Sequence, residues 1–387
     1  MRILVDITPC EWRSLWIYAC RILRVWKSNN QADIPIRLLI KANMEDYVKS
    51  EFPEFEYIVF RPYEYRNKFQ QLFKYKCFLV GKQWKKTINA QHDCDIVISL
   101  GIETSCFWKI KIPKIQVVHD LYPLRVWKGS ARFLYRLFVP YILRHSAGII
   151  AITKYVKQDL LQTYPFLSAD KITVIHNGVP LPSVDGGENQ RMDYSYLLYI
   201  STLYEYKNVG TLVKAFIKLK DAIPHKLVIV GKTTPYWEDI VLPLIRQAGI
   251  EDRIVHLSHY VSDEDIVRLY RSAAILISPS LHEGFGYTPI EAAICKTPVI
   301  CTKETALPEV TMGLVNYYEP SLDSEALKNA ILEVLNNYPS EKRLQTISDT
   351  FKESYDNTRQ AMKIYEYVVG YAVSYTHLRA HETSQDL

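Results

Sequence analysis

Short apolar, β-rich runs alternate with longer amphipathic segments along almost the whole chain of 387 residues. In the first half these runs are Ile3–Ile7, Ile36–Ile40, Ile96–Ser99, Lys114–Val118, Gly148–Thr153 and Ile172–Ile175. In the second half they are Tyr196–Ile200, Lys226–Val230, Arg253–Leu257, Ala274–Pro279 and Val299–Cys301. Strands that alternate with helices form parallel sheets covered on both faces, so the sequence predicts an α/β fold.

The chain is too long for one ordinary hydrophobic core, which predicts two domains. A polar stretch rich in proline and glycine, Pro180–Asp193, separates the two sets of runs and is typical of a linker. We therefore expect two doubly wound, Rossmann-like domains, residues 1–180 and 195–350, joined by a linker at 181–194. Ligands of such sheets bind outside the C-terminal strand ends, which would here face a central cleft.

Charge is divided unevenly between the two halves. Residues 1–180 carry 27 Lys and Arg against 15 Asp and Glu, whereas the remainder carries 20 against 27. The stretches 66–92 and 121–158 contain no acidic residue. A basic, aromatic half predicts an anionic partner, and an anionic membrane surface fits better than nucleic acid, for which no recognition motif is present.

The stretch 66–92 also contains an apolar stripe at helical spacing. Its members are Phe69, Leu72, Phe73, Val80 and Trp84. This stripe suits either a bilayer surface or a helix packed on its own sheet. No apolar run approaches the length of a membrane span, so we expect a cytoplasmic protein that is peripheral at the inner face of the cell membrane.

The sequence "HEGFGYTPIEAA" (His282–Ala293) places Glu283 and Glu291 on either side of a Gly-Phe-Gly hinge. Thr288 followed by proline, with Glu291 three residues later, predicts a helix start with a capping box. A glycine-rich loop that enters a helix N-terminus presents backbone N–H groups, which suits an anion such as a phosphate.

These residues resemble the retaining nucleotide-sugar glycosyltransferases of family 4, the "glycosyl transferases group 1", which have the two-domain GT-B fold. The resemblance is carried by "YISTLYEYKNVGTLVKAF", "LVIVGK" and "SPSLHEGFGYTPIEAA", in which Glu283 to Glu291 matches the family's E-x7-E element. "IQVVHDLYPL" and "ITVIHNGV" in the first half agree more loosely. The expected activity is transfer of a hexose from a nucleoside-diphosphate sugar to a lipid-linked or growing bacterial surface glycan.

The resemblance implies roles for individual residues. Catalytic roles fall to His119, near the sugar and acceptor, and to Glu283, beside the donor sugar. The donor would be bound by Lys207, Asn208, Gly284, Phe285, Gly286, Tyr287 and Glu291, with Glu291 on the ribose hydroxyls. No cofactor or metal is expected, because Lys207 and the backbone N–H groups of the loop would stabilise the leaving diphosphate.

Each role has a structural alternative: Glu291 as a helix cap, Phe285 as core packing and His119 as a hydrogen-bonded structural histidine. The chain also departs from the family pattern, with Tyr206 where an arginine usually precedes the lysine and Ser201 at a usual glycine. A catalytically degenerate, glycan-binding or scaffolding subunit is therefore the alternative function. A glycan phosphorylase or sucrose-type synthase is the alternative within the same fold.

The C-terminal part of the chain consists of two segments with different expected origins. Residues 351–372 resemble the family's C-terminal helix, which crosses back to the N-terminal domain. Residues 373–387 resemble the in-frame translation of a sequencing-library adapter, so we expect them to be an artefact that replaces the gene's true 3′ end.

Overall fold

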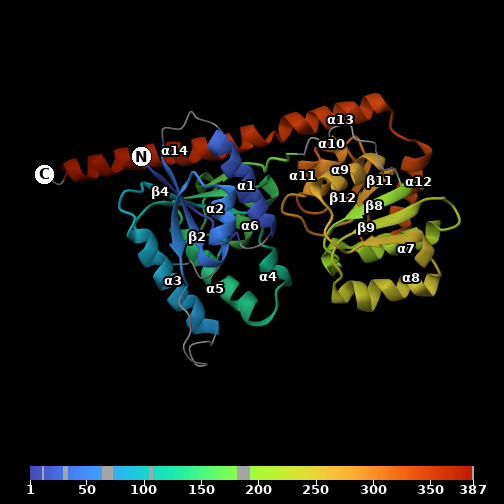
Figure 1. Cartoon of the computed structure of the whole chain (residues 1–387), viewed down its shortest axis with the longest axis horizontal. Coiled ribbons are helices and arrows are strands. Elements are labelled where there is room, and N and C mark those ends of the chain that lie inside the picture. The colour runs from blue at the N-terminus through green and yellow to red at the C-terminus, as the bar shows by residue number, and fades with distance from the viewer. Residues whose placement is uncertain (11–12, 29–33, 63–72, 104–107, 181–191, 386–387) are drawn as a thin grey trace. The chain divides into compact units, whose positions relative to one another are not determined.

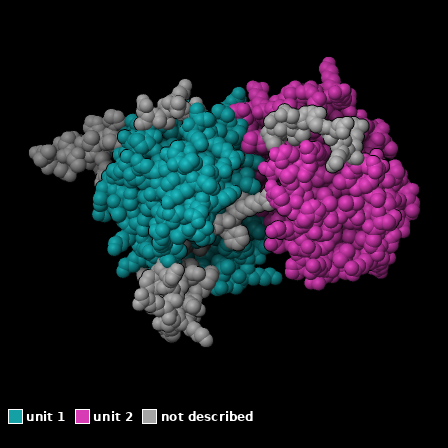
Figure 2. Space-filling view, viewed as in Figure 1, with its two compact units in different colours: residues 1–178, 357–387 teal, residues 179–356 magenta. Residues whose placement is uncertain are grey.

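The structure is a computed structural model that describes residues 1–10, 13–28, 34–62, 73–103, 108–180 and 192–385. The side chains of residues 13, 73–78 and 376–385 are outside this description. The chain forms two compact units: unit 1 contains residues 1–178 and 357–387, and unit 2 contains residues 179–356 (Figure 2). Each unit has its own sheet and its own core.

Unit 1 is built on a seven-stranded parallel sheet with the order β3-β2-β1-β4-β5-β6-β7. The strands are β1 (Ile3–Asp6), β2 (Ile36–Lys41), β3 (Glu56–Phe60), β4 (Ile96–Ser99), β5 (Lys114–Val118), β6 (Gly148–Ala151) and β7 (Ile172–Val174). The helices are α1 (Arg13–Ser28), α2 (Glu45–Glu51), α3 (Phe73–Asn89), α4 (Tyr122–Val126), α5 (Gly129–His145), α6 (Lys154–Thr163) and α14 (Asn357–Gln385). Strands β1, β4, β5 and β6 are buried along their whole length, as expected of a parallel sheet covered on both faces.

Unit 2 is built on a six-stranded parallel sheet with the order β10-β9-β8-β11-β12-β13. The strands are β8 (Tyr196–Ile200), β9 (Lys226–Val230), β10 (Ile254–Leu257), β11 (Ile275–Ser278), β12 (Val299–Thr302) and β13 (Asn316–Tyr318). The α-helices are α7 (Val209–Leu219), α8 (Leu242–Ala248), α9 (Asp263–Ser272), α10 (Tyr287–Ile294), α11 (Leu307–Val310), α12 (Ser324–Asn336) and α13 (Glu341–Ser354).

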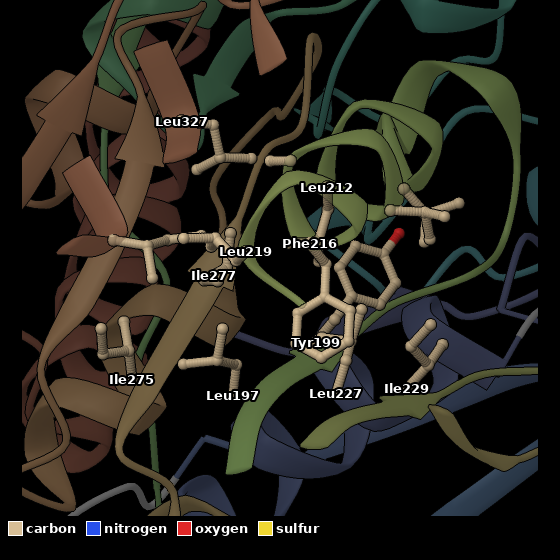
Figure 3. Packing of buried hydrophobic residues seen from close by; sticks show 14 of the residues in the cluster. Leu197, Tyr199, Leu212, Phe216, Leu219, Leu227, Ile229, Ile275, Ile277 and Leu327 are labelled. Carbon is tan, nitrogen blue, oxygen red and sulfur yellow. The ribbon is translucent and has the colours of Figure 1, made fainter. Parts of the chain in front are cut away.

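A hydrophobic core of unit 2 lies between the sheet and the helices on one of its faces (Figure 3). Leu197 and Tyr199 of β8 and Ile277 of β11 meet Leu212 and Phe216 of α7, and each is at most 1% exposed. The strands contribute alternate residues, such as Leu197 and Tyr199 of β8, while α7 contributes residues four apart on one face. Truncating one of these side chains to alanine would cost about 2–5 kcal/mol of unfolding free energy.

The predicted α/β fold of two parallel sheets is confirmed. Two strands, β3 and β13, were not predicted from the sequence. Both lie at a sheet edge, where Glu56 is exposed and Asn316 and Tyr317 are only partly buried. Partly buried strands show less of the apolar pattern by which buried parallel strands are recognised, although the other two edge strands, β7 and β10, were predicted.

The C-terminal helix differs from the single helix predicted over residues 351–372. The helix is interrupted at Tyr355 and Asp356. Phe351 therefore belongs to α13 in unit 2, and α14 begins at Asn357. Helix α14 packs along α1 within unit 1 (Figure 1). The Trp26 indole N–H donates to the Ala361 carbonyl at 2.9 Å, and the Tyr371 hydroxyl donates to the Ala147 carbonyl at 3.0 Å.

Candidate active site

The candidate site in unit 2 lies where the connections of the sheet reverse direction. From β8 the chain proceeds outward through β9 to β10, and then returns to the other side of β8 through β11. The loops that follow β8 and β11 therefore leave the C-terminal ends of two neighbouring central strands. This position is the topological switch point, where doubly wound sheets bind their ligands.

Lys207 and Glu283 come together across this switch point. Lys207 ends a short 3-10 turn after β8, and Glu283 lies in the loop after β11. The Lys207 ammonium donates to Glu283 Oε1 at 2.7 Å, and the two side chains are only 13% and 18% exposed. The Glu283 backbone N–H donates to Thr305 Oγ1 at 2.9 Å, which fixes the loop against the connection after β12.

The Lys207 ammonium also contacts an aromatic ring. It lies 5.1 Å from the centroid of the Tyr206 ring, within the range of a cation–π contact. Tyr206 in turn stacks on Tyr204, with an interplanar angle of 11°. The position at which the family pattern has an arginine thus carries an uncharged ring that contacts the lysine.

Asn208 supports the site through the backbone. It has a left-handed conformation (φ 59°), which asparagine tolerates better than most residues. Its side-chain amide donates to the carbonyls of Pro279 and Ser321 at 3.0 and 2.8 Å. Asn208 is only 4% exposed, so in this structure it ties three loops at the strand ends together.

The loop that follows Glu283 enters α10 through Gly286. Its φ of +90° is unfavourable for other residues, and a Cβ there would lie 2.7 Å from Leu307 Cδ2. Phe285 is 3% exposed, and its ring packs edge-on against the Tyr355 ring with 5.4 Å between the centroids. This agrees with the alternative interpretation of Phe285 as a core residue. Gly284 and Tyr287 are partly exposed beside it.

The predicted capping box is wrong. Helix α10 begins at Tyr287 with Gly286 as its N-cap and without a side-chain cap, because the turn at Gly286 starts the helix earlier than Thr288 would. Glu291 instead accepts a hydrogen bond from the Tyr270 hydroxyl of α9 at 3.0 Å. Burial, together with the nearby Glu291 carboxylate, raises the pKa of Tyr270 well above its usual value, so this hydroxyl remains a donor.

His119 lies in unit 1, directly after β5. Its Nε2 is 2.9 Å from the Leu100 carbonyl, and its ring meets the edge of the Tyr18 ring at 4.6 Å. Burial lowers the pKa of His119 to about 4, so the imidazole is neutral at pH 7. Asp120 accepts from the Tyr122 backbone N–H at 2.9 Å, at the start of α4, whose N-cap residue is Leu121.

The basic helix α3 separates its apolar and charged residues. Val80, Trp84 and Ile88 are buried against the sheet of unit 1, so this part of the stripe packs on its own sheet, which was the structural alternative. Phe69 and Leu72 lie outside the described residues. Lys82 and Lys86 are exposed on the opposite face, and Lys85 lies 5.6 Å from the Trp108 ring.

Two features of the site were not found from the sequence. Tyr270 contacts Glu291 from another helix, 21 residues away, and Thr305 comes from the connection after β12. Neither residue type at these positions carries a sequence signal of its own. Within the part of the chain that the structure describes, no three His, Cys, Asp or Glu side chains gather as a metal site requires, and no helix is long and apolar enough to cross a bilayer.

Comparison with solved protein structures identifies the fold class. The fold resembles a glycosyltransferase from Rickettsia africae, with a TM-score of 0.70, 20% identity, and coverage of 95% of this chain and 98% of that one. It also resembles Anabaena Alr3699/HepE, solved in complex with UDP and glucose, with a TM-score of 0.70, 16% identity, and coverage of 96% and 100%. Two doubly wound parallel sheets with these neighbours define the GT-B fold.

The family follows from the sequence. Residues 185–351 match the model of the glycosyl transferases group 1, and residues 49–182 match that of glycosyltransferase family 4. The chain belongs to these glycosyltransferases, as the E-x7-E element predicted.

Two of the relatives are named O-antigen chain mannosyltransferases. O-antigen chain mannosyltransferase B of Escherichia coli is 33% identical over 144 residues, which cover 37% of each chain. O-antigen chain mannosyltransferase RfbU of Salmonella typhimurium is 27% identical over 222 residues, which cover 56% of this chain and 59% of that one. The chain thus spans less than two thirds of the length of both relatives.

Proposed function

We propose that this chain is a retaining, metal-independent hexosyltransferase. It would transfer a sugar from a nucleoside diphosphate to a lipid-linked or growing bacterial surface glycan. The names of the relatives support a surface polysaccharide as the product. The complexes of Anabaena Alr3699/HepE with UDP and with UDP-glucose support a nucleotide-sugar donor.

The observation that carries this proposal is the Lys207–Glu283 ion pair at the switch point of the unit 2 sheet. Departure of a nucleoside diphosphate concentrates negative charge on phosphate oxygens. An ammonium group held in place before the reaction stabilises that charge by about 2–4 kcal/mol. Lys207 is held in place by Glu283 and Tyr206, and donor phosphates would replace Glu283 as its partner.

The loop between Glu283 and α10 would provide the remaining contacts. Gly284, Gly286 and Tyr287 place backbone N–H groups at the N-terminus of α10, where the helix dipole favours an anion. Glu291 would accept from the ribose hydroxyls while Tyr270 fixes its carboxylate. Glu283, released from Lys207, would contact the donor sugar.

His119 would act on the acceptor side. A neutral imidazole can accept a hydrogen bond from a sugar hydroxyl through one nitrogen while the other donates. Here Nε2 lies at hydrogen-bond distance from the Leu100 carbonyl, which leaves Nδ1 as the acceptor. We therefore expect His119 to orient a hydroxyl near the reacting carbon.

Turnover tests this proposal. Purified protein is incubated with UDP, GDP and ADP sugars, with and without a lipid-linked glycan extract, and release of nucleoside diphosphate is measured. Acceptor-dependent release that Glu283→Gln abolishes supports a transferase. A glycan phosphorylase would instead depend on inorganic phosphate, and a sucrose-type synthase on a free sugar acceptor.

A degenerate binding subunit is the second candidate, favoured by one observation. Tyr206, which stacks on Tyr204, stands where the family pattern has an arginine. Lys207 is therefore the one Lys or Arg in residues 201–208 that could bind a donor phosphate. Such a protein would bind a donor or a glycan, but no acceptor would cause it to release nucleoside diphosphate. Tyr206→Arg is the sharpest discriminator, because it adds a phosphate partner that raises turnover only if the machinery is otherwise complete.

We further propose that the protein is cytoplasmic and peripheral at the inner face of the membrane, where lipid-linked acceptors are located. The exposed Lys82 and Lys86, together with Lys85 and Lys111, line one hollow of unit 1 with Trp108. Each such lysine near anionic lipid contributes about 1 kcal/mol of attraction.

A further inference from the structure

Helix α5 carries a row of exposed apolar side chains. Phe133, Leu137 and Tyr141 are 54%, 54% and 40% exposed. They lie four residues apart, so they share one face of the helix. Just before the helix, Val126 and Trp127 are also exposed, by 42% and 41%. Single exposed apolar residues are common, but a continuous row over two turns requires an explanation.

This row is not part of the core of unit 1. The buried residues of α5 lie on its other face, and they are Leu134, Tyr135, Val139, Ile142 and Leu143. The helix therefore already has a complete packing face. On the described part of α3, Val80 and Trp84 of the apolar stripe are buried, whereas Lys82 and Lys86 are exposed.

Positive charge flanks the row. Lys128, Arg132, Arg136 and Arg144 are exposed on α5 or directly before it. Arg125 is not counted with them, because it pairs with the buried Asp159. The acid-free stretch 121–158 contains the whole helix, so this surface is complementary to an anionic one.

The nature of the partner follows from charge and geometry. A second copy of the chain would bring the same cations against each other, which opposes a symmetric contact. Arginines beside a narrow row of aromatic and aliphatic side chains are typical of a helix that lies in the plane of a bilayer. There the apolar row enters the acyl boundary and the guanidinium groups contact lipid phosphates.

We propose that α5 is the element that inserts into an anionic bilayer, with Phe133, Leu137 and Tyr141 as the inserted residues. The inference rests on the proposed peripheral membrane location and names the surface that produces it. The α3 lysines would then add long-range attraction. Helices α3, α4 and α5 all extend toward the lower edge of unit 1 in Figure 1, which is compatible with one docking face.

The test compares two double variants by sedimentation with vesicles of phosphatidylcholine containing about one third phosphatidylglycerol. Phe133→Ser with Leu137→Ser should lower vesicle partitioning at least tenfold. The matched control is Ile240→Ser with Leu322→Ser, which changes two apolar residues of unit 2 that are 52% and 69% exposed. The control should bind like the wild type.

Salt separates insertion from charge attraction. Raising the ionic strength from about 0.1 to 0.5 M screens surface charge, so binding that persists in the wild type reports apolar insertion. That persistent fraction should be absent from the α5 variant. A wild type that loses all binding in salt, or an α5 variant that binds like the control, would overturn the proposal.

A gain-of-contact variant covers the case in which the serine variant is unstable. Leu137→Trp should partition at least as well as the wild type, and brominated acyl chains should quench its added fluorescence. Absence of quenching excludes insertion. If the serine variant changes self-association by analytical ultracentrifugation but not vesicle binding, the row is a dimer contact and the proposal fails. None of these measurements depends on turnover, so failure of the transferase proposal would be seen separately.

Discussion

Glu291 has a structural partner in addition to its proposed ligand. The Tyr270 hydroxyl donates to its carboxylate, and glutamine can accept the same hydrogen bond through its amide oxygen. Glu291→Gln should therefore change the free energy of unfolding by only about 1 kcal/mol. Loss of a charged acceptor at the ribose should weaken donor binding by about tenfold or more.

Calorimetric titration of the donor into Glu291→Gln, beside thermal unfolding, checks this prediction. Tyr270→Phe is the matched control, since it removes the hydroxyl and leaves the carboxylate. It should lower stability more than donor affinity. Unchanged donor affinity in Glu291→Gln would reduce Glu291 to a contact between α9 and α10.

Glu283 should behave differently, because its proposed partner is the sugar. Glu283→Gln removes the carboxylate that holds Lys207, which leaves the ammonium available to phosphates. Nucleoside diphosphate alone should bind at least as tightly as to the wild type, while transfer should fall by at least about a hundredfold. Calorimetry with the diphosphate and a turnover assay measure the two effects. Loss of diphosphate binding together with turnover would place Glu283 on the nucleotide instead.

His119 should make stability depend on pH. Its pKa is lowered to about 4 in the folded chain, against an unfolded value of about 6.5, so between these values the unfolded chain binds the additional proton. Stability should thus rise with pH across this window, by at most about 3 kcal/mol from this group. His119→Gln should flatten the dependence measured by urea unfolding from pH 4 to 7. An identical slope in the variant would contradict the burial of a neutral imidazole.

The burial of side chains along α14 predicts where the chain can be shortened. Ala361, Ile364, Val368 and Ala372 are at most 2% exposed, whereas Val373 is 45% exposed and Ser374 is exposed. Truncation after Ala372 should therefore leave the melting temperature unchanged. Truncation after Asp356 removes the whole helix and should lower it by more than about 10 °C, because several apolar side chains worth about 1.5–3 kcal/mol each lose their packing.

Differential scanning calorimetry of the two truncated chains makes this comparison. A clear fall after removal of residues 373–387 alone would show that this segment contributes to the fold, against the prediction that it is an adapter artefact.

The lysines of α3 give a further prediction at the scale of the element. Replacing Lys82, Lys85 and Lys86 together by glutamine should weaken binding to anionic vesicles and reduce its salt dependence, since three cations leave the surface. The buried face of α3 with Trp84 is untouched, so the fold should be retained. Vesicle sedimentation over a salt series checks this, with Lys218, Lys328 and Lys352 of unit 2 as matched sites. Equal losses in both triple variants would remove any specific role of α3.

Elements also show what the sequence could predict. The bounds of β4, β5, β8 and β9 were predicted to the residue, because each is a short, mostly apolar run rich in β-branched residues or leucine. Edge strand β3 was not, since its side chains are only partly buried. Lys207 and Glu283 were each named as site residues through the family resemblance, but their ion pair was not predicted. The Glu291–Tyr270 contact depends on how α9 packs on α10. Packing between helices leaves no local pattern in the chain.

At the scale of the whole molecule, two sheets carry different chemistry. Unit 2 holds the loops proposed to bind the donor at its switch point, and the basic unit 1 holds His119 and the surfaces proposed to meet the membrane. The chain belongs to the group 1 glycosyltransferases, and we propose that both units contribute to one transfer reaction. The departures at Ser201 and Tyr206 lie in the loop after β8, within the proposed donor site, so we expect them to affect the rate of transfer and not the fold.

The central claim is that the ion pair at the switch point belongs to a working transferase. Release of nucleoside diphosphate from UDP, GDP and ADP sugars, with a lipid-linked acceptor extract, tests it most directly when the wild type, Glu283→Gln and Tyr206→Arg are compared. We expect release from at least one donor, stimulated by the acceptor, lost in Glu283→Gln and retained or increased in Tyr206→Arg. If both the wild type and Tyr206→Arg bind a donor tightly but release no nucleoside diphosphate, the central claim is contradicted and the protein is a binding subunit.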